Sequence, residues 1–132
     1  MTQITGAHHI AIRTTQFDRC VAFYTQTLGL TTTATWTTKT GRAAMIEIAP
    51  GSYMEIFERP AAAEANPVIL HVCLRTDDVV GMTERVRAAG YRVTTEPLTL
   101  DLETSIGIVK LHLAFVAGPD GESIELMASD KF

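Results

Sequence analysis

The sequence is poor in the features that mark secreted scaffolds and membrane proteins. It has only two cysteines, Cys20 and Cys73, which excludes a disulfide-stabilised scaffold and favours a reduced, cytoplasmic setting. No apolar run approaches the ~18 residues of a membrane-spanning helix. The first residues lack the charged start and apolar core of a signal peptide, so we expect the chain to have none.

The sequence also has no large excess of positive or negative charge. The formal net charge is −4 at pH 7, which offers no basic field for nucleic acid or an anionic membrane. The sequence has no heptad pattern, no glycine-rich phosphate loop, no Cys-x-x-Cys and no Gly-x-Ser-x-Gly. With 132 residues and 46% hydrophobic side chains, the chain is expected to be one soluble domain, residues 1–132.

A repeat organises the chain. The stretch from His9 to Thr14 returns 62 positions later, from His71 to Thr76, and both copies read His, β-branched, small, aliphatic, Arg, Thr. Further along, Glu55 in one strand-like stretch matches Glu125 in another at an offset of 70. The second copy therefore carries about eight more residues, which we place between residues 97 and 108. Such self-similarity indicates two structural modules.

Hydrophobic periodicity predicts the order βαβββ in both copies. The first module covers residues 6–59, the second covers residues 68–129, and a proline-bounded linker lies at 60–67. Helices are expected at 17–27, ended by Gly29, and after Asp77 or Asp78, ended by Gly90. Strands are expected at 7–13, 30–39, 43–49, 52–58, 68–75, 91–96, 108–116 and 122–127. The sequence at 98–105 predicts neither a helix nor a strand.

Four polar residues recur within the predicted strands, one histidine and one glutamate in each module. They are His9, Glu55, His71 and Glu125. Taken singly, a strand histidine is usually just half-buried and a glutamate near a strand end usually faces solvent. Four buried and unpaired polar groups would be costly, whereas convergence on a divalent cation removes that cost. Two imidazoles and two carboxylates suit Zn, Ni, Co, Mn or Fe(II) and leave coordination positions open for substrate.

Other polar residues carry weaker signals. Arg13 and Arg75 share the face of each histidine, where they bind an anionic substrate or pair with an acid at a strand end. Cys73 can line a cavity, and no base accompanies it as a nucleophile would require. Four aromatic or sulfur-containing residues are expected either to line a pocket or to belong to the ordinary core. They are Trp36, Tyr53, Phe57 and Met127. His8 and His112 have no counterpart in the other copy of the repeat, so both are predicted not to be metal ligands.

Together these stretches resemble the vicinal oxygen chelate superfamily, which includes glyoxalase I, methylmalonyl-CoA epimerase, extradiol dioxygenases, and fosfomycin and bleomycin resistance proteins. The segments that carry the resemblance are His8–Ile12, Phe23–Leu30, Tyr53–Phe57, His71–Val72 and Gly118–Leu126. The resemblance implies an α+β fold, in which tandem βαβββ modules form a cupped mixed sheet around a metal. It places the ligands on the same His/Glu/His/Glu set, which is similar to that of glyoxalase I. The epimerases usually have Gln at the position of Glu55.

The resemblance also implies a function. Members with this ligand set are metal-dependent lyases or isomerases that hold two vicinal oxygens of a small substrate, form an enediolate and use a glutamate as proton shuttle. Glu125 or Glu55 would be that shuttle, with Glu125 favoured by analogy, and Arg13, Phe57, Cys73 and Arg75 would line the substrate site. Arg13 matches the arginine that contacts the glutathione carboxylate in glyoxalase I. The segment from Phe57 to Pro60 replaces that family's Asn-Trp-Gly-like segment, which argues against glutathione as carrier.

Two alternatives stay open. The first is an antibiotic- or metabolite-binding protein of the bleomycin-resistance type without catalysis, and the second is an Fe(II) dioxygenase. Proteins of this length in the superfamily commonly act as homodimers, so each metal site is built from one chain or shared between two. No nucleic acid or membrane partner is expected.

Overall fold

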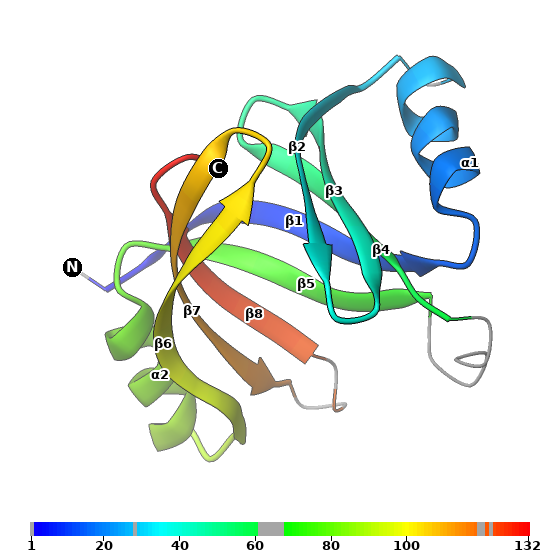
Figure 1. The fold of residues 1–132 in the computed structure, drawn as a ribbon. Helices are drawn as coiled ribbons and strands as arrows, with labels where there is room; N and C mark the ends of the chain where they lie inside the picture. Colours follow the sequence, from blue (N-terminus) through cyan, green and yellow to red (C-terminus); the bar gives the residue numbers. More distant parts are fainter. Residues whose placement is uncertain (1, 28, 61–67, 119–120, 122) are drawn as a thin grey trace. The chain divides into compact units, whose positions relative to one another are not determined.

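The computed structural model describes residues 2–27, 29–60, 68–118, 121 and 123–132. The elements are β1 (Ile4–Thr14), α1 (Phe17–Ala22), a π-helical turn η1 (Phe23–Thr27), β2 (Thr31–Thr38), β3 (Gly41–Ala49), β4 (Ser52–Glu58), β5 (Ile69–Thr76), α2 (Val79–Ala88), β6 (Val93–Thr104), β7 (Gly107–Ala117) and β8 (Ser123–Ser129) (Figure 1). This order confirms the α+β fold class with two βαβββ modules. Of the predicted linker, residues 61–67 lie outside the described part of the chain.

The chain divides into two compact units that nearly follow the modules. The N-terminal unit consists of His9–Leu70 and Glu103–Gly107. The C-terminal unit consists of Met1–His8, His71–Leu102 and Ile108–Phe132. Each unit therefore includes a short segment from the other half of the sequence.

Four strands of the N-terminal unit follow the order β2-β3-β4-β1. β1 runs parallel to β4, and β3 runs antiparallel to β2 and β4. One face of this sheet packs against α1, because apolar side chains alternate along the strands and recur at helical spacing in α1. The core there consists of buried Ala44, Ile46 and Ile56 with Ile12, Phe17, Cys20, Val21, Tyr24, Leu30 and Met54 around them.

The helix predicted at 17–27 changes character after Ala22 and ends as the π-helical turn. The hydroxyl of Thr25 donates to the carbonyl of Val21 at 2.8 Å, a side-chain bond that competes with regular helix geometry. The amide of Leu30 donates to the carbonyl of Tyr24 at 3.0 Å and closes the end. Gly29 has φ 74° there, a conformation that glycine adopts without strain.

The C-terminal unit repeats this plan with the strand order β5-β8-β7-β6. β5 runs parallel to β8, and β7 runs antiparallel to β8. Helix α2 begins at Val79 and is capped by Asp78, whose carboxylate accepts the amide of Gly81 at 2.8 Å. Its buried face joins Met82, Val116 and Leu126 in one core cluster. The opposite face of the sheet carries a second cluster, which consists of Cys73, Leu113 and Met127 with Leu100, Leu111 and Phe115 around them.

The extra residues of the second module lengthen a hairpin. The strand predicted at 91–96 continues to Thr104, so the stretch at 98–105, for which no structure was predicted, is largely strand. β6 and β7 have 12 and 11 residues, against 8 and 9 for the equivalent β2 and β3. Leu100 and Leu102 are half-buried while Asp101 is exposed, which is the period of two expected for a strand.

Hydrogen bonds fix the two exchanged segments. At the hairpin tip, Ser105 bonds to the edge strand β2 through Thr35. Near the start of β1, the carbonyl of Gln3 accepts the Thr76 hydroxyl at 2.8 Å, and the amide of Gln3 donates to Asp77 at 2.9 Å. Neither helix in the described ranges is long and apolar enough to cross a bilayer.

Candidate metal centre

The N-terminal unit brings two of the predicted ligands together. His9 lies on β1 and Glu55 on β4, and the ladder pairs Glu55 with Ala11, the next residue on the face of His9. Nε2 of His9 lies 3.2 Å from Oε1 of Glu55. Both residues are buried, at 3% and 8% exposure. A buried carboxylate thus faces a buried imidazole on the side of the sheet away from α1.

The C-terminal unit brings the other two together in the same way. His71 lies on β5 and Glu125 on β8, and the ladder pairs Glu125 with Cys73. Nε2 of His71 lies 2.9 Å from Oε2 of Glu125. Glu125 is 5% exposed and His71 is half-buried. The predicted repeat of one His and one Glu per module therefore corresponds to one short His–Glu contact per unit.

The chemistry of these pairs fits a divalent cation. In both units it is the Nε2 atom that faces the carboxylate, so the histidines present the same ligand atom. A proton on Nε2 satisfies such a pair when no cation is bound, and a cation with imidazole and carboxylate ligands replaces that proton. Imidazole nitrogen and carboxylate oxygen are ligands of Zn, Ni, Co, Mn and Fe(II).

The predicted substrate residues of the N-terminal unit lie on the same face as its His–Glu pair. Arg13 is the ladder partner of Phe57 on β4. The Phe57 ring meets the Trp36 ring edge-on, with centroids 6.3 Å apart and planes at 85°. The guanidinium of Arg59 lies 5.1 Å from the Phe57 ring centroid. Trp36, interpreted as pocket wall or core, is buried at 8% exposure.

In the C-terminal unit, the predicted substrate residue Arg75 holds the position equivalent to Arg13, and Cys73 holds the position equivalent to Ala11. Cys73 is fully buried and stands beside Glu125 in the ladder, while Arg75 stands beside Met127. Both cysteines of the chain are free thiols. Burial raises the pKa of the Cys20 thiol, despite an opposing hydrogen bond to Thr14.

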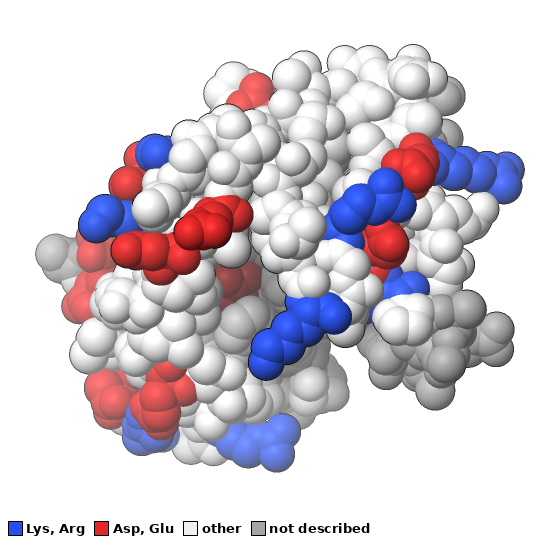
Figure 2. Space-filling view, in the orientation of Figure 1, with Lys and Arg blue, Asp and Glu red and all other residues white. Residues whose placement is uncertain are grey.

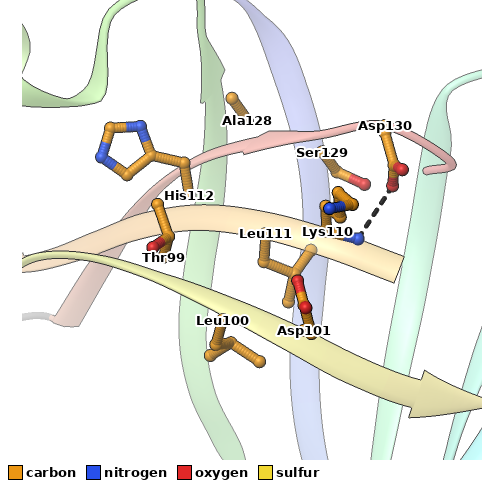
Figure 3. A pocket seen from close by; sticks show the side chains of 9 residues that line it. All are labelled: Thr99, Leu100, Asp101, Lys110, Leu111, His112, Ala128, Ser129 and Asp130. Atoms are coloured by element: carbon orange, nitrogen blue, oxygen red, sulfur yellow. Dashed lines mark hydrogen bonds between the residues drawn. The ribbon is translucent and has the colours of Figure 1, made fainter. Parts of the chain in front are cut away.

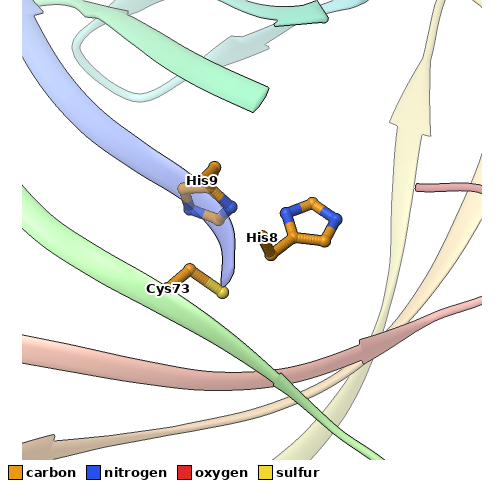
Figure 4. A group of neighbouring side chains, drawn as sticks. All are labelled: His8, His9 and Cys73. Carbon is orange, nitrogen blue, oxygen red and sulfur yellow. The ribbon is translucent and has the colours of Figure 1, made fainter. Parts of the chain in front are cut away.

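His8 and His112 were predicted not to be ligands, yet in the C-terminal unit the possible ligand atoms of His8 and Cys73 lie within 4.8 Å of each other. Figure 4 shows His8 and His9 as successive residues of β1, with Cys73 on β5. The His8 ring lies 6.1 Å from the ring of Phe132 near the chain's end, and His8 is buried at 1% exposure.

His112 lines a pocket of about 480 Å³ in the C-terminal unit. Figure 3 shows Thr99 and His112 toward one end, and Asp101, Lys110 and Asp130 toward the other. A carboxylate oxygen of Asp130 accepts the backbone amide of Lys110 at 2.9 Å. None of the predicted ligand or substrate residues is among the described residues that line this pocket. The His–Glu pairs are therefore kept as the candidate site, and this pocket is separate from the predicted residues.

Surface charges are engaged in local pairs. On the face drawn in Figure 2, acidic and basic side chains of the described residues are interspersed. Arg42 donates to Asp18 at 2.8 Å and to Glu58 at 2.6 Å, and these bonds raise its pKa. On the other unit, Arg87 donates to Glu96 at 2.7 Å and lowers the pKa of that carboxyl. These guanidinium groups are already engaged by carboxylates.

Two residues beside the candidate ligands were missed by the sequence analysis. The ladders pair Glu55 with Met45 and Glu125 with Phe115. Met45 and Phe115 are 70 positions apart, the same offset as the two glutamates. Aligning the repeats through the glutamates, and then counting back along the preceding strand, would have found both.

Comparison with known proteins identifies the class. A family model described as Glyoxalase/Bleomycin resistance protein/Dioxygenase superfamily matches residues 6–126. The chain belongs to this superfamily. A probable lactoylglutathione lyase of Vibrio cholerae is 27% identical over 126 residues, which cover 90% of this chain and 87% of that protein. A probable lactoylglutathione lyase of Vibrio parahaemolyticus is 25% identical over 126 residues, with the same coverage of both chains.

Solved structures share the fold. Methylmalonyl-CoA epimerase from Mycobacterium tuberculosis has a TM-score of 0.74 and 19% identity, over 94% of this chain and 87% of that chain. The Mn(II)-bound glyoxalase from Novosphingobium aromaticivorans has a TM-score of 0.72 and 20% identity, over 96% of this chain and 40% of that chain. At these identities the likeness establishes a common architecture.

Proposed function

We propose that the protein is a divalent-metal-dependent isomerase or lyase of the glyoxalase type, which acts on a small substrate through two neighbouring oxygen atoms. The observation that carries this proposal is the His–Glu pair that each unit holds, with Nε2 to carboxylate distances of 3.2 and 2.9 Å. The proposed ligands are His9, Glu55, His71 and Glu125. A single centre with all four requires the two faces to meet around one cation, within one chain or across a homodimer.

The names of the similar proteins support the reaction class. Two probable lactoylglutathione lyases are among the sequence relatives, and a methylmalonyl-CoA epimerase and a Mn(II)-bound glyoxalase are among the structures with this fold. Both kinds of ligand in the proposed set suit the same divalent cations. We assign the reaction to the cytoplasm, in line with the free thiols of both cysteines.

When bound, a divalent cation supplies Lewis-acid polarisation of a carbonyl oxygen and its neighbour, which acidifies the adjacent C–H. The protein's own part is to move the proton. Glu125 takes the proton from that carbon and returns it to the substrate. Its carboxylate is buried, and Cys73 and Phe115 flank it in the ladder, which limits competing protonation by water. Glu55 is the alternative base, and it is buried in the equivalent position.

The proposed substrate residues act around this chemistry. Arg13 and Arg75 would bind an anionic group of the substrate, since each lies four residues beyond a proposed histidine ligand. Phe57 and Cys73 would bound the apolar part of the site. The Phe57 ring is held from two sides by Trp36 and Arg59, which supports a rigid wall.

The test begins with untagged protein. Metal content is measured by mass spectrometry, and the metal-free protein is then loaded with Zn, Ni, Co, Mn or Fe(II). Each form is assayed for lactoylglutathione lyase and methylmalonyl-CoA epimerase activity. We expect stoichiometric metal, and we expect Glu125→Gln to keep the metal while turnover falls by about 10²-fold or more. Undiminished turnover in Glu125→Gln would exclude the role given to this residue.

The same experiment separates the competing functions. Protein without stoichiometric metal, and with no gain on its addition, points to a binding protein, for which the Trp36–Phe57 contact offers an aromatic surface. Turnover that requires dioxygen points to an Fe(II) dioxygenase. Either result would replace the isomerase proposal.

A further inference from the structure

The two proposed histidine ligands are held by different surroundings. The His9 side chain is 1% exposed, whereas the His71 side chain is 12% exposed. Tyr53, a large buried residue, stands beside His9 in the β1–β4 ladder. In the second unit the equivalent place next to β5 is taken by Ser123, which is small and exposed and precedes the Ile124 that pairs with Val72. Neighbouring side chains on the next strand therefore restrict the His71 ring less than the His9 ring.

One aromatic ring, that of Phe115, contacts His71. The centroids of His71 and Phe115 are 5.2 Å apart and the ring planes meet at 84°, an edge-to-face arrangement. Phe115 is the ladder neighbour of Glu125, and it packs against the cluster of Cys73, Leu113 and Met127. The Phe115 ring is thus anchored in the core and meets His71 beside the carboxylate that faces Nε2.

We propose that Phe115 is a positioning residue for the second half of the metal centre, because it fixes the His71 ring with Nε2 directed at Glu125. This inference rests on the proposed function, since it assumes that His71 is a ligand. Edge-to-face contact restrains rotation of an imidazole about its terminal torsion, which is otherwise broad. A ligand that is already oriented loses less conformational freedom when it binds a cation. In this role Phe115 acts through the His71 ring and is not itself a ligand.

The repeat supplies a matched control. Met45 holds the position equivalent to Phe115, as the ladder neighbour of Glu55, and it is fully buried. Methionine has no ring with which to orient His9, and His9 is itself buried. Met45→Leu and Phe115→Leu therefore change apolar side chains at equivalent positions, and only the second removes an aromatic contact to a proposed ligand.

The experiment measures affinity of the metal-free protein for Zn²⁺ by competition with a fluorescent chelator. We expect Phe115→Leu to weaken Zn²⁺ binding by about five- to tenfold, the size expected for loss of one aromatic contact. Phe115→Tyr keeps the ring and is expected to stay within about twofold of wild type. Met45→Leu is expected to do the same. Loss of affinity in Met45→Leu equal to that in Phe115→Leu would mean general loosening of the core and would overturn the inference.

A spectroscopic signature tests the orientation directly. The Phe115 ring current shifts the carbon-bound ring protons of His71, and we expect this shift to be lost in Phe115→Leu and kept in Phe115→Tyr. His71→Ala distinguishes the two proposals. If His71→Ala loses Zn²⁺ while Phe115→Leu binds it as tightly as wild type, only the role of Phe115 fails. If His71→Ala binds Zn²⁺ like wild type, the proposed metal centre fails, and this inference fails with it.

Discussion

Thr35 on the edge strand β2 and Ser105 at the tip of the β6–β7 hairpin exchange two hydrogen bonds. The amide of Thr35 donates to the Ser105 hydroxyl at 2.8 Å, and the amide of Ser105 donates to the Thr35 carbonyl at 2.9 Å. The hairpin therefore covers part of a strand edge whose backbone groups would otherwise face water. The additional length of this hairpin in the second module is what supplies the residue at its tip.

The first prediction concerns this contact. Ser105→Ala removes the acceptor of the Thr35 amide and is expected to speed hydrogen exchange of that amide, with about 1 kcal/mol or less of lost stability. Thr37→Ala, two residues along the same strand, is the control and should leave the Thr35 amide unchanged. Native-state hydrogen exchange followed by NMR measures both, and unchanged exchange in Ser105→Ala would contradict the prediction.

The second prediction separates the two faces of β4. Ile56 is fully buried on the face covered by α1, whereas its neighbour Glu55 faces the candidate metal centre. Ile56→Ala is expected to lower the free energy of unfolding by about 2–5 kcal/mol through the cavity it leaves. Ile10→Ala, at a position 40% exposed, should cost far less. Urea titration measures both variants, and a small effect of Ile56→Ala would mean that α1 does not close this core.

The third prediction concerns substrate affinity. Arg13→Gln is expected to raise KM for an anionic substrate about tenfold with a smaller change in kcat, because a charge-assisted contact is lost away from the reacting carbon. Arg75→Gln is the matched variant, since the two arginines hold equivalent places in the repeat. Steady-state kinetics on the activity found in the assays gives both constants. A loss confined to kcat would instead assign Arg13 to the chemical step.

The fourth prediction concerns acid stability. The Thr2 hydroxyl donates to Asp78 at 2.5 Å and the Gly81 amide donates at 2.8 Å, and both bonds lower the pKa of this carboxyl. A lowered pKa in the folded state contributes stability above the ordinary pKa of aspartate, and this contribution is lost as pH falls through the folded value. Asp78→Asn should therefore be less stable than wild type at neutral pH, and the difference should shrink below about pH 4.

Melting curves between neutral and acid pH check this behaviour. Thr2→Val is the companion variant, because it removes only the hydroxyl donor and should reduce the pH-dependent part of the difference. If the difference in melting temperature between wild type and Asp78→Asn stays constant with pH, the carboxylate charge has no part in capping α2.

The sequence predicted the fold through its repeat. Alternating apolar residues placed β4 at residues 52–58, as the structure has it, and Gly29 and Gly90 ended the helical segments where expected. Asp78, one of two candidates, is the N-cap of α2. These features depend on neighbours in sequence, so local physics decides them. Strand parity also placed Arg13 on the face of His9, but the parallel pairing of β1 with β4, which brings Glu55 to His9, was not predicted.

Other features depend on partners far away in the chain. The stretch at 98–105 alternates Leu with acidic or hydroxyl residues, yet its strand character depends on pairing with β7 and on the tip contact to Thr35. No hydrophobic pattern in the sequence distinguishes the π-helical turn from the α-helix before it. The role of Phe115 becomes visible only when the register of β7 against β8 is known. Register is set by the whole ladder and not by any single residue.

The exchange of short segments between the two units has a consequence for dissection of the protein. The start of β1 is held by Thr76 and Asp77, and the β6–β7 tip is held by Thr35. Cutting the chain after Pro60 would therefore not give two independently folding fragments. Each fragment would lack the short segment of the other half that completes its unit. Refolding of either fragment alone should fail, whereas mixing both should restore the missing pieces by complementation.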